Sequence, residues 1–218
     1  MKQNLERIKI FLIKNYKWIL LFICIISLLI LIKNVMNKDI EIFDEKGYAI
    51  VSKYLISDTI TPFAKFITNF ANPYLLVSLA ILLFIFVKNK KVGAIIAINL
   101  GLSAILNLVL KHILRRSRPP IEHRIIYEKG YSLPSGHSMV SMAFYGLLIY
   151  FIYQNVKNKF LKITLMISIS ILIISIGISR IYLGVHYISD VIAGFLFAIT
   201  YLILYLHIIE NIKKDKLL

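Results

Sequence analysis

Long apolar runs recur along this chain, and short clusters of lysine and arginine separate them. Hydrophobic residues make up 59% of the 218 residues and charged residues only 17%. A soluble domain of this size would need far more polar side chains to cover its surface. Apolar runs bounded by basic residues are typical of helices that cross a membrane. The pattern predicts an all-α, polytopic integral membrane protein, with a single domain over residues 1–218.

Six apolar segments account for most of the hydrophobic residues, and they predict a bundle of six transmembrane helices. They cover residues 18–32, 67–87, 92–110, 138–153, 161–178 and 187–209. Asn72 and Pro73 interrupt the second segment, so an alternative start for its helix is Pro73. The first segment follows a basic N-terminus, and no small-residue cleavage site comes after it. We therefore expect an uncleaved membrane anchor rather than a removed signal peptide.

The basic clusters also predict how the chain crosses the membrane. Lysines precede the first segment, follow the sixth, and fill the second and fourth connections. Since cytoplasmic loops carry the excess of lysine and arginine, residues 1–17 and both termini are expected in the cytoplasm. The connections 33–66, 111–137 and 179–190 then face outside the cell membrane. In 33–66, irregularly spaced apolar residues predict short helices at the membrane surface that flank a lipid entrance.

The net charge of +15 does not indicate a nucleic-acid-binding protein. The basic residues form short clusters at the ends of apolar runs, not one continuous face, and few aromatic residues lie among them. Cys24 is the only cysteine, so the chain cannot form an internal disulfide. No segment of the sequence points to an obligate protein partner.

Cations and a helix start are expected together on the outer side. Lys111, Arg118 and Arg180 are cations, and the two guanidinium groups match the geometry of phosphate oxygens. Ser135 to His137 begin the fourth segment, where free backbone N–H groups and the helix dipole attract an anion. Gly136 would let the backbone approach a phosphate closely. These residues together predict a phosphate-binding site.

Two histidines in the outer connections suggest nucleophilic catalysis. His186 is expected to open the sixth helix, and Asp190 lies four residues on, hence on the same helical face. The Asp190 carboxylate can accept a hydrogen bond from one ring nitrogen of His186 and leave the other free to attack phosphorus. His137 would protonate the departing oxygen and later activate water.

These segments resemble the motifs of the type 2 phosphatidic acid phosphatase superfamily, in order and residue for residue. The motifs are KxxxxxxRP from Lys111, PSGH from Pro134, and SRxxxxxHxxxD from Ser179, and Gly194 also matches. The resemblance implies a six-span fold, a phosphohistidine intermediate, and no metal or cofactor. It implies a lipid phosphate monoester or pyrophosphate as substrate, such as phosphatidylglycerophosphate, undecaprenyl pyrophosphate or phosphatidic acid. The chain looks most like the small bacterial phosphatidylglycerophosphate and undecaprenyl-pyrophosphate phosphatases of this superfamily.

Some polar residues have simpler interpretations. Asn99, Ser103, Asn107 and Lys111 are spaced by four, which predicts hydrogen bonds between helices and turns this face into the bundle. Arg115, Arg116 and Arg124 lie outside the motif positions and are predicted to be secondary.

Two rival functions remain open on the sequence. One is a metal-dependent hydrolase that uses His137, His186 and Asp190, although the surrounding cations would repel a metal ion. Sensitivity to a chelator would separate it from the phosphohistidine enzyme. The other is a non-enzymatic lipid-binding or transport protein. That class predicts charges deep within several spans, whereas the lysines and arginines here lie at span ends or in loops.

Overall fold

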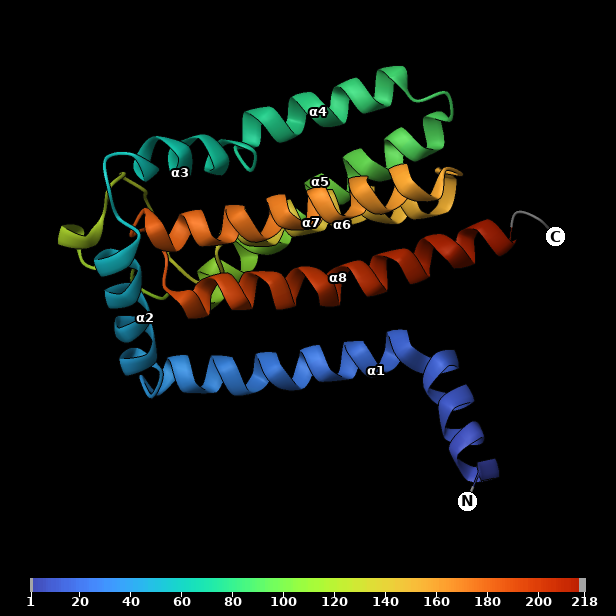
Figure 1. Ribbon diagram of the computed structural model, residues 1–218, viewed down its shortest axis with the longest axis horizontal. Coiled ribbons are helices and arrows are strands. Elements are labelled where there is room, and N and C mark those ends of the chain that lie inside the picture. The colour runs from blue at the N-terminus through green and yellow to red at the C-terminus, as the bar shows by residue number, and fades with distance from the viewer. Residues whose placement is uncertain (1, 216–218) are drawn as a thin grey trace.

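The computed structural model describes residues 2–215 as a bundle of helices (Figure 1). Met1 and residues 216–218, at the two ends of the expected domain, lie outside the described residues. The elements are α1 (Lys2–Met36), α2 (Glu41–Tyr54), α3 (Ile60–Asn69), α4 (Pro73–Phe86), α5 (Lys90–Leu114), the 3-10 helix η1 (Ile121–His123), α6 (Gly136–Asn155), α7 (Lys159–Tyr182) and α8 (Ile188–Asp215). Residues 2–215 contain no strand, which confirms the all-α class.

Five of these helices are long and apolar enough to cross a membrane: residues 14–36 of α1, α5, α6, α7, and residues 188–212 of α8. The bent pair α3 and α4, which meet at an angle of 46°, makes a sixth candidate span when the two helices are counted together. By itself, α4 is about 21 Å long and falls short of a hydrocarbon core of about 30 Å. The chain is therefore a multi-pass membrane protein, as predicted.

The break in this pair lies where Asn72 and Pro73 interrupt the apolar segment. Asn72 caps α4, since its side chain accepts a hydrogen bond from the Tyr74 N–H at 2.9 Å. Pro73 occupies the first helical position, where its missing N–H costs nothing. The helix therefore starts at Pro73, the alternative that the sequence offered.

The centre of the bundle is α6, which packs against α5, α7 and α8. Its Phe144 and Leu147 are fully buried and meet Ile176 of α7 and Leu202 of α8 in the main core. Gly194 allows a close approach of α8 to the start of α6, because a Cβ there would lie 2.9 Å from the Ser135 carbonyl oxygen. Small residues permit such contacts between membrane helices. The first turns of α6 and α8 are thereby held together.

One end of the bundle is crossed by α2, which packs against α7 and α8 (Figure 1). Ile42, Phe43 and Ile50 on this helix are exposed, while Asp44 is buried. The short helices expected within residues 33–66 are therefore present, and α3 continues to Asn69.

The polar stripe of α5 faces the bundle interior, as predicted. Asn99, Ser103 and Asn107 are buried. Asn99 Nδ2 donates to the Ala143 carbonyl at 3.0 Å, and Asn107 Nδ2 to the Pro134 carbonyl at 3.4 Å. Lys111 is one turn further along the same face, and this places its side chain among the three segments that carry the motifs.

Candidate active site

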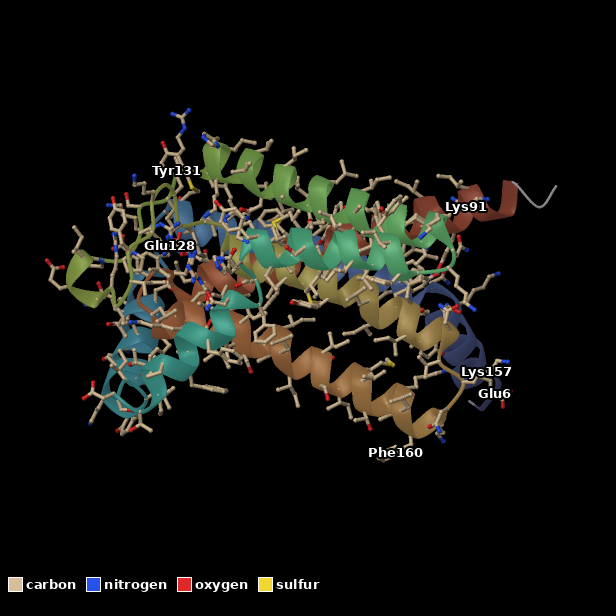
Figure 2. All side chains as sticks on the ribbon, turned by 90° about the horizontal axis from the view of Figure 1, so that it is seen from above. Glu6, Lys91, Glu128, Tyr131, Lys157 and Phe160 are labelled. Atoms are coloured by element: carbon tan, nitrogen blue, oxygen red, sulfur yellow. The ribbon has the colours of Figure 1, made fainter. Side chains whose placement is uncertain are left out.

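The three motif segments meet at the end of the bundle crossed by α2. Glu128 and Tyr131 lie at this end in Figure 2, and Lys91 and Lys157 lie at the opposite end. The connection between α5 and α6 folds back over the site, because the Ser132 N–H donates to the Arg116 carbonyl at 2.9 Å. Segments far apart in the sequence therefore supply one cluster of charged side chains.

His186 and Asp190 form the expected pair. His186 Nδ1 lies 3.4 Å from Asp190 Oδ2, and both residues are buried. The prediction that His186 opens a helix is wrong, because α8 begins only at Ile188. His186 lies instead in the turn before α8, and Asp190 lies in the first turn of that helix. The Tyr187 N–H donates to Asp190 Oδ2 at 3.0 Å and fixes this oxygen from the side of the turn.

The other nitrogen of His186 faces Arg118. Arg118 Nη1 lies 3.2 Å from His186 Nε2. Because a guanidinium only donates, Nε2 is the acceptor and the ring proton belongs on Nδ1, toward Asp190. Burial lowers the pKa of His186 well below its ordinary value, and Arg180, Lys111 and Arg118 lower it further. The imidazole is therefore neutral at neutral pH, with its Nε2 lone pair directed toward the cations.

The three expected phosphate-binding cations surround the same space. Lys111 Nζ donates to the Tyr131 carbonyl at 2.6 Å, and Arg118 also donates to the Val185 carbonyl at 2.9 Å. Arg180 is 1% exposed, and its Nη1 donates to Thr68 Oγ1 at 2.7 Å. Its buried Nε has no hydrogen-bond partner among the described residues.

Glu128 lies between the two arginines, a position that the sequence analysis did not identify. Its Oε1 accepts from Arg180 Nη2 at 2.6 Å, and its Oε2 lies 3.9 Å from Arg118 Nη2. The Glu128 side chain is 29% exposed, whereas that of Arg180 is 1% exposed. A single, partly exposed carboxylate thus offsets one of the two positive charges of these largely buried arginines.

The start of α6 lies beside these cations. Ser135 is the N-cap, and its side chain accepts from the Ser138 N–H. Its own N–H donates to the Asp190 carbonyl at 3.0 Å. Among the described residues, no hydrogen-bond partner is found for the amides of Gly136 and His137, the other two N–H groups of this helix start. A Cβ on Gly136 would lie 3.0 Å from Asn107 Oδ1, so glycine lets α5 and α6 approach closely here.

A groove of about 620 Å³ runs from His137 along α4, α5 and α6. Its lining is apolar except near the candidate active site, where Asn107 and His137 border it. Between Ala97 and Asn107 it extends along about 15 Å of α5. Val77, Ile81 and Leu108 line it and are also exposed, so it is open toward the surrounding membrane. The His137 ring lies at the mouth of this groove, and it has no hydrogen-bond partner among the described residues.

Arg116 belongs to the site, and the prediction that it is secondary is wrong. Its Nη1 donates to Asp190 Oδ1 and its Nη2 to Asp44 Oδ2, each at 2.7 Å. Asp44 lies within the connection 33–66, where the sequence analysis predicted no site residue. Among the described residues, the side chains of Arg115 and Arg124 donate to nearby backbone carbonyls, those of His112 and Pro119 respectively.

The metal-dependent alternative requires a set of ligands. Among the described residues, no group of at least three His, Cys, Asp or Glu side chains is placed to hold a metal ion. The pair His186 and Asp190 is surrounded by cations instead, as described above.

A family model described as the PAP2 superfamily matches residues 92–214. The chain belongs to the PAP2 superfamily. The matched region contains the three PAP2 motifs but not α1 to α4. Asp44 and the groove-lining residues between Ala71 and Phe84 therefore lie outside it.

Two curated relatives are similar in sequence. Phosphatidylglycerophosphatase B of Bacillus subtilis (strain 168) is 33% identical over 124 residues, which are 56% of this chain. The match spans 60% of that relative, less than two thirds of its length. An undecaprenyl-diphosphatase of Sulfolobus acidocaldarius is 29% identical over 189 residues, which cover 84% of this chain and 86% of the relative.

Two solved structures support the fold. The crystal structure of a transmembrane PAP2 type phosphatidylglycerolphosphate phosphatase from Bacillus subtilis has a TM-score of 0.80 and 25% identity. The alignment covers 88% of this chain and 96% of that one. The structure of Aquifex aeolicus LpxE has a TM-score of 0.62 at 23% identity, and this match concerns the fold alone.

Proposed function

We propose that this chain is a membrane lipid phosphatase that hydrolyses a terminal phosphate monoester or pyrophosphate through a phosphohistidine. Membership of the PAP2 superfamily, and relatives named as phosphatases, indicate a lipid phosphatase. The observation that carries the proposal is the junction of a cationic cluster with an apolar groove at His137, which lines the groove and lies within electrostatic range of Arg180 and Arg118. A phosphate group fits the cationic cluster, and a hydrocarbon chain fits the apolar groove.

The proposed reaction begins with attack on phosphorus. His186 Nε2 forms the N–P bond while the bond to the leaving oxygen breaks, and His137 donates a proton to that oxygen. Arg118, Arg180 and Lys111, with the amides at the start of α6, stabilise charge on the equatorial oxygens. His137 then takes a proton from water, which attacks the phosphohistidine and releases phosphate.

The position of the groove supports a lipid leaving group. Since His137 lies both at the mouth of the groove and beside the cations, the oxygen that it protonates carries the chain lying in the groove. A volume of about 620 Å³ is within the usual range for ligand pockets, about 300–1,000 Å³. We therefore propose that the alkyl chain of the substrate lies in this groove and contributes to binding.

Filling the groove should impair only long-chain substrates. Gly101 lines the groove, and a Cβ added there meets no atom within 4 Å, so the side chain of Gly101→Leu starts in open space at the groove wall. We expect KM for a long-chain lipid phosphate to rise about tenfold, while a short soluble phosphate ester is hydrolysed as before. Phosphate release from purified protein in detergent with excess EDTA measures both, and it also tests the metal-free mechanism.

The control for this variant is Val109→Leu, an exposed position on α5 outside the groove. If wild-type protein releases no phosphate from any lipid phosphate, the proposed function is wrong. If metal addition is required after EDTA, the metal-dependent hydrolase replaces it. Equal losses on both substrates in Gly101→Leu would refute the role of the groove.

We further propose that the site faces outside the cell, with both termini in the cytoplasm, because the lysine-rich connections lie at the opposite end of the bundle (Figure 2). Single cysteines in a Cys24→Ser background test this. Tyr127 is 77% exposed at the site end, and Lys157 is exposed at the other end. A membrane-impermeant thiol reagent added to intact cells should label Tyr127→Cys and not Lys157→Cys until the cells are lysed. The reverse pattern would invert the topology.

A further inference from the structure

Arg116 holds two buried carboxylates at once. Its two terminal nitrogens donate to Asp190 Oδ1 and to Asp44 Oδ2, each at 2.7 Å. The Arg116 side chain is 12% exposed and both acids are 0% exposed. Ionised groups buried to this degree need charged partners. The guanidinium is therefore the group that allows the two acids to share this part of the interior.

Other contacts fix the guanidinium in place. Ser189 donates to Asp44 through both its N–H, at 3.0 Å, and its hydroxyl, at 2.6 Å. Arg116 Nη1 also donates to Ser189 Oγ at 2.7 Å. The Tyr187 ring lies against the guanidinium, with 4.2 Å from Arg116 Cζ to the ring centroid. Arg116 is thus held on several sides by α2, by the turn before α8, and by the start of α8.

Arg116 and His186 use different oxygens of Asp190. Oδ1 accepts from Arg116, whereas Oδ2 faces His186 Nδ1 and also accepts from the Tyr187 N–H. A carboxylate with one oxygen in a short charge-assisted bond cannot turn without breaking that bond. Arg116 therefore keeps Oδ2 directed at the imidazole. The His186 contact, at 3.4 Å, is itself too long to fix the carboxylate.

We propose that Arg116 and Asp44 are positioning residues for the His186 and Asp190 pair. Arg116 orients the Asp190 carboxylate, and Asp44, supplied by α2, holds Arg116 in the orientation that does so. This inference rests on the proposed phosphatase function. Asp44 lies outside residues 92–214, so a helix beyond the matched PAP2 region completes the active site.

The charges predict an unusual pattern among variants. Two carboxylates and one guanidinium carry a formal charge of −1. Arg116→Met raises the negative charge to −2 and leaves two buried acids without their shared partner. Adding Asp44→Asn returns the cluster to −1 and removes the repulsion. The second substitution should therefore restore activity that the first one removes, although each removes a native contact.

The experiment measures kcat and KM for phosphate release from a long-chain lipid phosphate. Arg116→Met should lower kcat about 10²-fold, with KM unchanged within about threefold, because Arg116 does not touch the phosphate. Arg116→Lys keeps the charge and should recover about tenfold of that loss. Asp44→Asn in the Arg116→Met background should raise kcat about tenfold above Arg116→Met.

Arg115→Met is the matched control, since Arg115 is exposed and bonds only the His112 carbonyl. Its kcat should equal that of wild type. A double variant no more active than Arg116→Met, or a loss confined to KM, would overturn the inference. Should Arg116→Met fail to fold, Asp44→Asn alone decides, because a kcat equal to that of wild type contradicts the role of Asp44. An inactive wild type refutes the phosphatase function itself, whereas an active wild type with equally active variants refutes only this inference.

Discussion

His186→Ala is expected to abolish both turnover and phosphoenzyme formation. In the proposed mechanism, Nε2 of this residue forms the bond to phosphorus, and an alanine offers no replacement. The pKa of His186, lowered by burial and by the nearby cations, keeps the ring unprotonated at neutral pH, so that the nucleophile is available. Loss of a nucleophile costs at least about 10⁴-fold in kcat.

The measurement is rapid mixing with labelled substrate, followed by an alkaline denaturing quench that preserves an N–P bond. Bound label is then counted on the protein. His112→Ala is a matched control, because His112 is exposed and its ring contacts the Leu108 carbonyl and the Tyr131 ring rather than His186 or His137. Turnover in His186→Ala within tenfold of wild type would rule out the phosphohistidine.

His137→Ala is expected to separate the two chemical steps. A lipid alkoxide needs a proton as it leaves, so kcat on lipid phosphates should fall by about 10²–10⁴-fold. An activated aryl phosphate has a leaving group that needs no proton and should still phosphorylate His186. Since His137 would also activate water, the phosphoenzyme should accumulate.

The same quench assay tests this prediction, and the double variant His137→Ala, His186→Ala should retain no label. A phosphoenzyme in His186→Ala and none in His137→Ala would show that the two roles are reversed. A His137→Ala enzyme that turns over the aryl phosphate at the wild-type rate would show that another group activates water.

The sequence was enough to predict the fold because membrane helices follow from local composition. Five of the six apolar runs each correspond to a single long helix, and the second is divided between α3 and α4 at the Asn72–Pro73 break, which follows from local capping. The start of α8 was misplaced, because the turn at residues 183–187 depends on tertiary contacts. One of these is the Ile125 N–H, which donates to the Leu183 carbonyl at 3.1 Å.

The motif residues of the site could be predicted, but their partners could not. Arg116 contacts Asp190 and Asp44, which are 74 and 72 positions away. Glu128 is 52 positions from Arg180. No periodicity or local spacing links such pairs. In the sequence, an acid in a connection between two spans cannot be told from a solvent-exposed surface residue. Only the packing of α2 and the fold of the connection between α5 and α6 bring these acids to the arginines.

Glu128 gives the two arginines an anion before any substrate arrives. On the proposed function, binding then becomes an exchange, in which a phosphate takes the place of a partly exposed carboxylate. A terminal phosphate, with up to two negative charges, gains from this exchange. A phosphodiester has a single charge, as the carboxylate has, and gains little. The competing carboxylate would therefore discriminate against the ordinary phosphodiester lipids that crowd the membrane around the site, and reserve the arginines for lipids that end in phosphate.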